Sequence, residues 1–168
     1  MDLTPQATAG DSTATARSTR TASASASASA RLRRSSLGAV FALLVQYGLG
    51  MGVNLFVNVP DADQGKGVGA AFGKSFSNGP AALAAHAGIG LLLVINVIVV
   101  LVTAFRARHR VALVSSIVGA LCVIGAAFSG ADFVDKGANG SSMTMAVLTG
   151  VAIACYALNL YVLGAERD

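Results

Sequence analysis

Four long stretches of this sequence contain no Asp, Glu, Lys or Arg: residues 37–57, 81–105, 111–129 and 142–164. Each is 19 to 25 residues long, and about 20 helical residues cross the roughly 30 Å hydrocarbon core of a bilayer. Only 12% of the chain is charged. All 20 charged residues lie in the other 80 positions, which therefore have the charge density of an ordinary soluble segment. This partition excludes a water-soluble globular domain and indicates a polytopic membrane protein.

The apolar stretches predict helices rather than strands. Inside lipid every backbone amide must be paired within its own segment, which an α-helix achieves. Strands of a transmembrane barrel alternate apolar and polar residues over about ten positions, whereas the run at 90–101 (GLLLVINVIVVL) is continuous. We therefore predict an all-α fold, a four-transmembrane-helix bundle over residues 36–164, with no second domain.

The two ends of the chain differ from the apolar stretches. Residues 1–35 are mostly Ala, Ser and Thr, and such a composition lacks the apolar content to bury a core, so we predict a disordered cytoplasmic tail. Residues 165–168 form a cytoplasmic stub. The first apolar stretch is too long for a signal peptide, whose apolar region has about 7–15 residues, and no A-x-A cleavage site follows it. We therefore expect a retained first membrane helix.

The basic residues predict the topology. All nine arginines lie in the N-terminal segment, in the connection at 106–110 or at the C-terminus, whereas all three lysines lie in the connections at 58–80 and 130–141 beside four aspartates. Arginine and lysine accumulate on the cytoplasmic side of membrane proteins. Both termini are therefore predicted to be cytoplasmic in a multi-pass protein of the cell membrane. The same distribution argues against a nucleic-acid partner and leaves the lipid bilayer as the predicted surrounding.

Small side chains recur at helical spacing within the spans, which predicts where helices pack. Membrane helices associate by close approach at small residues and by hydrogen bonds. In the fourth span, alternating intervals of four and three residues separate Met145, Thr149, Ala152, Tyr156 and Asn159. The residues that we expect at helix contacts are Gly48, Gly52, Gly88, Ser115, Gly119, Cys122, Ala126 and Gly150.

Four polar residues within the spans predict a small pocket: Gln46, Asn54, His86 and Asn96. Counted from the middle of their spans, Asn54 and His86 are each about seven residues, or roughly 10 Å, towards the outer side. His86 has three interpretations: an interhelical hydrogen bond, a metal or haem ligand, or a proton-relay or substrate contact. For a metal such as copper(I), which accepts thioether and imidazole ligands, the candidates are His86, Met51, Met143 and Met145. No catalytic set can be assembled from residues that share a face and a depth.

Four segments carry a resemblance to a known group: residues 54–60 (NLFVNVP), 85–93 (AHAGIGLLL), 125–130 (GAAFSG) and 156–161 (YALNLY). Through these segments the chain resembles the small four-helix integral membrane proteins of high-GC actinobacteria, an uncharacterised group, over residues 37–163. The resemblance implies a multi-pass location in the inner membrane. It assigns no activity, cofactor or functional residue.

Three functional hypotheses follow. The first is a non-enzymatic interaction or accessory subunit, which forms a homo-oligomer or binds a membrane-protein partner and needs no cofactor. The second is a metal- or haem-handling membrane redox protein that uses His86. The third is a small transporter or channel with a path lined by Gln46, Asn54, His86 and Asn96.

Overall fold

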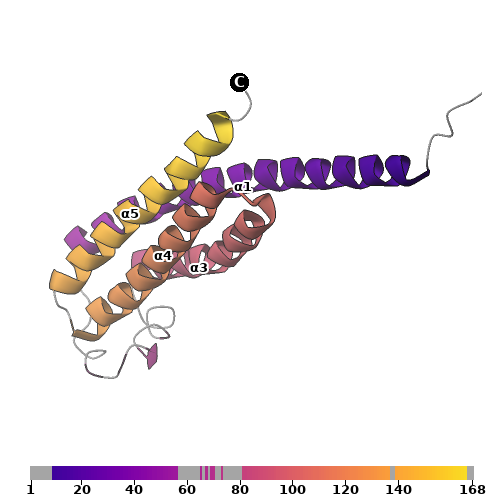
Figure 1. Ribbon diagram of the computed structural model, residues 1–168. Coiled ribbons are helices and arrows are strands. Elements are labelled where there is room, and N and C mark those ends of the chain that lie inside the picture. The colour runs from indigo at the N-terminus through magenta and orange to yellow at the C-terminus, as the bar shows by residue number, and fades with distance from the viewer. Residues whose placement is uncertain are drawn as a thin grey trace, which may run out of the picture.

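The computed structural model describes residues 9–56, 65, 67, 69–70, 73, 81–136 and 139–165. Among these residues it contains the helices α1 (Ala9–Phe56), α3 (Ala81–Ala107), α4 (Arg110–Lys136) and α5 (Asn139–Gly164), and no strand (Figure 1). Within this part of the chain, four helices are long and apolar enough to cross a membrane. The predicted four-helix, all-α architecture is confirmed at this level.

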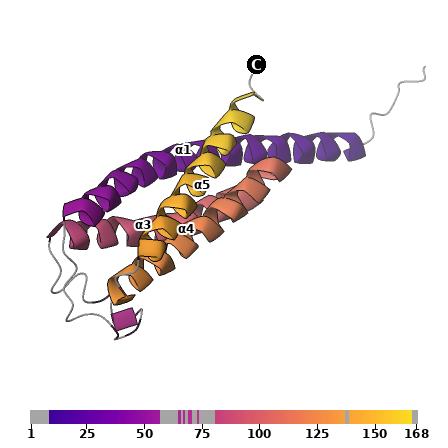
Figure 2. The same ribbon diagram turned by 90° about the vertical axis from the view of Figure 1, so that its left-hand side faces the viewer.

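The four helices form a closed ring. α1 packs against α3 and α5, and α4 packs against the same two helices, with the most extensive contact between α4 and α5. Figure 2 shows α5 crossing in front of the other helices, with α1 reaching far beyond them at one end. The ring arrangement encloses a central space to which all four helices contribute.

The connection between α3 and α4 shows how the sequence reverses direction. Arg108 follows the last residue of α3 and adopts a left-handed conformation with φ of 57°, the backbone geometry that commonly ends a helix. The Nδ1 atom of His109 then accepts a hydrogen bond from the Ala112 amide (3.2 Å) and satisfies one of the unpaired donors at the start of α4. Two residues therefore suffice for the tight hairpin that the short connection predicts.

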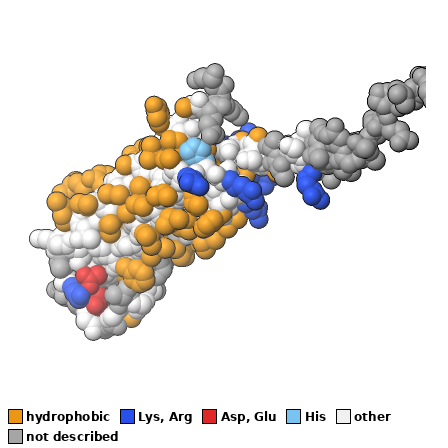
Figure 3. Space-filling model, viewed as in Figure 1, with side chains coloured by type: hydrophobic (Ala, Val, Ile, Leu, Met, Phe, Trp, Pro, Cys, Tyr) orange, Lys and Arg blue, Asp and Glu red, His pale blue; other side chains and the backbone are white. Residues whose placement is uncertain are grey.

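Large apolar side chains cover the outside of the bundle, as Figure 3 shows for one face. Exposed examples are Phe41, Leu55, Phe56, Leu92, Phe105, Leu121, Phe128 and Tyr161. Charged side chains gather at the two ends. We call one end the arginine end, defined by the exposed residues Arg31, Arg33, Arg34, Arg106, Arg108 and Arg110, and the other the aspartate end, defined by Asp132 and Asp135.

α1 begins much earlier than the sequence predicts. It starts at Ala9, so helix occupies most of the segment that we expect to be a disordered tail. Ala28, Leu32 and Ser36 are buried, Leu32 completely, and the Ser25 hydroxyl donates to the Ala107 carbonyl at the end of α3 (3.4 Å). The packed part of the bundle therefore begins before residue 36, where the sequence predicts its start. Alanine has the highest helix propensity, and Leu32 supplies the apolar contact that average composition conceals. Residues 1–8 and 166–168 lie outside the described residues.

The buried core has two parts. A large cluster fills the bundle from the arginine end to the level of Leu43, Leu93 and Val123. A small cluster of Val53, Leu83 and Val134 lies at the aspartate end. The bundle is therefore tightly packed towards both ends, and the two clusters are separated by a level between them.

The aspartate end is tied together by its own polar groups. Asp132 pairs with Lys136 and accepts a hydrogen bond from Ser141. The end of α4 also holds part of the connection between α1 and α3, because the buried Asp135 accepts a hydrogen bond at its carboxylate from the Gly67 amide (2.9 Å). Gly67 has φ of 86°, a left-handed conformation that glycine adopts without steric cost.

Candidate ligand pocket

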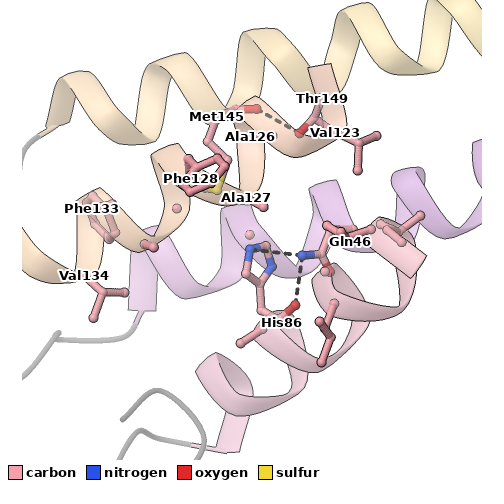
Figure 4. Close-up of a pocket in the computed structure, with 18 of the residues that line it drawn as sticks. Gln46, His86, Val123, Ala126, Ala127, Phe128, Phe133, Val134, Met145 and Thr149 are labelled. Carbon is pink, nitrogen blue, oxygen red and sulfur yellow. Dashed lines mark hydrogen bonds between the residues drawn. The ribbon is translucent and has the colours of Figure 1, made fainter. Parts of the chain in front are cut away.

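A cavity of about 410 Å³ lies between the two apolar clusters and is lined by all four helices. On one wall are Gln46 of α1 and His86 of α3, and on the opposite wall are Val123 and Phe128 of α4 with Met145 of α5 (Figure 4). Pockets for small molecules have volumes of about 300–1,000 Å³ and mostly apolar walls with a few polar groups. This cavity fits that description.

The lining is apolar apart from a few residues. No Asp, Glu, Lys or Arg lines the cavity among the residues that the structure describes. The Thr149 hydroxyl is used within α5, where it donates to the Met145 carbonyl (2.8 Å), and the Ser142 hydroxyl donates to the Asn54 side-chain carbonyl (3.1 Å). The remaining polar contribution comes from Gln46 and His86.

Gln46 and His86 form a contact between α1 and α3 whose proton arrangement can be deduced. The Gln46 Nε2 amide donates to the backbone carbonyl of His86 (2.9 Å) and lies 3.2 Å from the ring atom Nε2. Only the amide nitrogen can face a carbonyl oxygen at this distance, so the amide orientation is determined. Its second hydrogen then points to the ring, and His86 Nε2 is an acceptor. In a neutral imidazole the proton is therefore on Nδ1.

Two atoms of this pair have no hydrogen-bond partner. His86 Nδ1, which carries the proton, and the Gln46 carbonyl oxygen Oε1 are both buried and unpaired. Leaving one buried polar group unsatisfied costs about 1–3 kcal/mol. Two neighbouring residues of the cavity lining thus hold one unsatisfied donor and one unsatisfied acceptor, both covered by surrounding atoms.

Two glycines allow these side chains to fit between the helices. A Cβ atom at Gly50 would lie 2.9 Å from Cε1 of His86, and one at Gly90 would lie 3.1 Å from Nε2 of Gln46. Each helix therefore carries a polar residue followed four positions later by a glycine, and each glycine faces the polar residue of the other helix. This reciprocal arrangement brings α1 and α3 together at the cavity.

The predicted polar pocket is largely assembled in the structure. Gln46, Asn54 and His86 all line the cavity. Asn96 does not; it is half-buried elsewhere on α3. The Gly50–Gly90 pair is a further part of the site, and the sequence indicates it only through the repeated spacing of a polar residue and a glycine on both helices.

The predicted metal ligands are not brought together. Met145 lines the cavity, but Met51 and Met143 are outside its lining and their side chains are 44% and 67% exposed. Among the described residues, no group of three or more His, Cys, Asp or Glu side chains could hold a metal ion. The reason is helical phase: residues 143 and 145 differ by about 200° around α5, so they face opposite sides.

The predicted packing residues divide into two groups. On α4, Ser115, Gly119, Cys122 and Ala126 are all buried. A Cβ at Gly119 would lie 3.0 Å from the Tyr156 ring, which shows how closely α4 and α5 approach. By contrast, Gly48, Gly52 and Gly150 have no neighbouring atom within 4 Å of a built Cβ, so they make no close contact with another helix in the described part of the chain. Gly88 is half-buried.

A second polar cluster lies in the large core. The Asn159 amide donates to Ser116 (2.9 Å) and to Ser36 (3.4 Å), and all three side chains are fully buried. Tyr156, one turn away, is buried with its hydroxyl unpaired. The spacing within the fourth span predicts Asn159 and Tyr156 on a packing face, but no sequence pattern indicates the two serines. This cluster links α1, α4 and α5 on the arginine side of the cavity.

No protein-family model, curated protein or solved structure matches the chain.

Proposed function

We propose that this chain is a non-enzymatic multi-pass membrane protein that binds a small apolar molecule in the cavity between its four helices. The observation that carries the proposal is the apolar cavity of about 410 Å³ with one polar pair in its wall. The proposal places both termini on the cytoplasmic side of the cell membrane. It is supported by the apolar outer surface of the bundle and by the arginines at one end.

The polarity of the lining favours an apolar occupant. The cavity is partly open at the surface of the bundle, where Leu91, Ile124 and Phe128 of its lining are exposed. Water gains little in a cavity with so few polar partners. An apolar molecule covers the lining without that disadvantage.

The chemistry of the lining favours a neutral apolar ligand over the alternatives. A bound ion or charged substrate would be desolvated without a charged partner in the described lining, which is unfavourable. A channel is not favoured either, because the cavity ends at Leu43, Leu93 and Val123 and the large core continues beyond them.

The methionines provide a direct test. In protein labelled with ¹³C at the methionine methyl groups and held in detergent micelles, the Met145 signal should shift when 1-decanol is titrated. The Met51 and Met143 signals should change little, because both side chains lie outside the cavity lining. Equal shifts at all three positions would indicate unspecific partitioning and contradict the proposal.

A matched pair of variants sharpens this test. Ala127→Leu adds volume to the cavity wall and should abolish the Met145 shift. Ala154→Leu makes the same change at an exposed position of α5 outside the lining and should leave the shift unchanged. Retained binding in Ala127→Leu would place the ligand elsewhere.

A second candidate function is self-association, favoured by the open glycines of α1. Gly48 and Gly52 lie one turn apart with free space around them, and this spacing allows two membrane helices to approach closely. Gly48→Leu with Gly52→Leu should reduce crosslinked dimer in membranes, whereas Gly150→Leu, also at an open position, should not. A wild-type chain that is monomeric in membranes would refute this candidate.

A further inference from the structure

We propose that the molecule bound in the cavity carries a hydroxyl group, as a long-chain or polycyclic alcohol does, and that this hydroxyl pairs with Gln46 and His86. The inference rests on the proposed function, because it specifies the chemical class of ligand for the same cavity. It comes from the polarity of the two unsatisfied atoms in the cavity wall.

The pair offers one donor and one acceptor. Gln46 Nε2 uses its hydrogens on the carbonyl and on Nε2 of His86, so the proton on His86 Nδ1 and the lone pairs of Gln46 Oε1 remain unused. A hydroxyl group is the smallest neutral group that both donates and accepts. Its oxygen accepts from Nδ1–H, and its hydrogen is donated to Oε1.

Other headgroups complement the pair less well. A ketone or an ether only accepts and leaves Gln46 Oε1 unsatisfied, and a hydrocarbon leaves both atoms unsatisfied. An ammonium or a carboxylate brings a charge into a lining whose described residues include no opposite charge. A neutral alcohol satisfies both atoms and introduces no charge.

Binding requires a local shift of the polar pair. Both unsatisfied atoms are covered by surrounding atoms, so Gln46 and His86 must shift together, with the hydrogen bonds between them kept, to let a hydroxyl reach them. The apolar body of the ligand then lies against Met145 and Phe128 on the opposite wall.

The test compares three probes with equal numbers of heavy atoms: 1-decanol, 1-methoxynonane and undecane. Their affinities are measured on the full chain in micelles from the Met145 methyl shift, with dissociation constants expressed as mole fractions so that partitioning into detergent cancels. One additional hydrogen bond favours the alcohol over the ether by about three- to tenfold. Undecane should bind more weakly than the ether.

Two variants assign the preference to the polar pair. Gln46→Leu should bind all three probes with similar affinity, and His86→Phe should behave in the same way if the first variant does not fold. Asn96→Leu removes an amide from α3 outside the cavity lining and should retain the preference. Equal affinities for the three probes in the wild-type protein would overturn the inference and leave the proposed function intact. Failure of every probe to shift Met145 would overturn both.

Discussion

Replacing Gly50 by alanine tests how the polar pair is held between α1 and α3. The new Cβ would lie 2.9 Å from Cε1 of His86, closer than an ordinary van der Waals contact. The imidazole must therefore move, and its contact with Gln46 Nε2 at 3.2 Å is lost. Gly50→Ala should thus destabilise the bundle at the wall of the cavity.

The magnitude follows from three contributions. Overpacking costs about 1–3 kcal/mol, loss of one hydrogen bond costs about 0.5–1.5 kcal/mol, and replacing glycine by alanine within a helix gains about 0.5–1 kcal/mol. The expected net loss in the free energy of unfolding is about 2 kcal/mol. Gly52→Ala is the matched control, because nothing lies within 4 Å of its Cβ, and it should stabilise the protein by about 0.5–1 kcal/mol.

Reversible unfolding in mixed SDS micelles, followed by circular dichroism, measures both variants. His86→Ala should relieve the clash, so the double variant should show a coupling energy of about 1 kcal/mol or more. If Gly52→Ala destabilised the protein and Gly50→Ala did not, the helical phase of α1 described here would be wrong and the pattern of residues 48 and 52 would be the true contact.

Three further predictions concern other parts of the bundle. Leu32→Ala should lower the free energy of unfolding by about 2–5 kcal/mol because Leu32 is completely buried; an unchanged stability would favour the disordered tail. Tyr156→Phe should leave the stability unchanged or raise it by about 1 kcal/mol in the same unfolding assay, because the hydroxyl is buried without a partner, and a marked loss would reveal a hidden hydrogen bond. Asp135→Ala should speed hydrogen exchange at the Gly67 amide, because this amide donates a hydrogen bond to the Asp135 carboxylate. Unchanged exchange would show that this hydrogen bond does not form.

The sequence alone predicts the four long helices because the hydrophobic effect acts on whole segments. A charge within a span is so costly that the absence of charge over 19 to 25 residues identifies each helix. Depth along a helix is equally simple to count, since each residue rises about 1.5 Å. For this reason Gln46, Asn54 and His86 could be assigned to one pocket before the structure was known.

Rotation about the helix axis is what the sequence could not determine. Lipid tails are as apolar as leucine, so an apolar side chain on a membrane helix does not indicate which face is inside. Met51 and Met143 were expected beside Met145, and Gly48 and Gly52 at a contact, yet all four lie on faces directed away from the cavity and from close contacts.

The N-terminal part of α1 depends on a different kind of contact. Composition is an average over many residues, and the segment before residue 36 contains little apolar surface. A few buried side chains, with Leu32 the largest, are enough to hold a helix of alanine and serine against the bundle. Such a contact depends on the position of one residue rather than on the content of the segment.

Intermolecular nuclear Overhauser effects between 1-decanol and the methyl groups of the protein test the binding proposal most directly. We expect contacts from the decanol chain to the methyl groups of Met145 and Ala127, which line the cavity, and from the carbinol protons to the ring of His86. Contacts confined to exposed methyl groups such as those of Met51 and Met143 would show that the alcohol only coats the outer surface, and the proposed ligand pocket would be wrong.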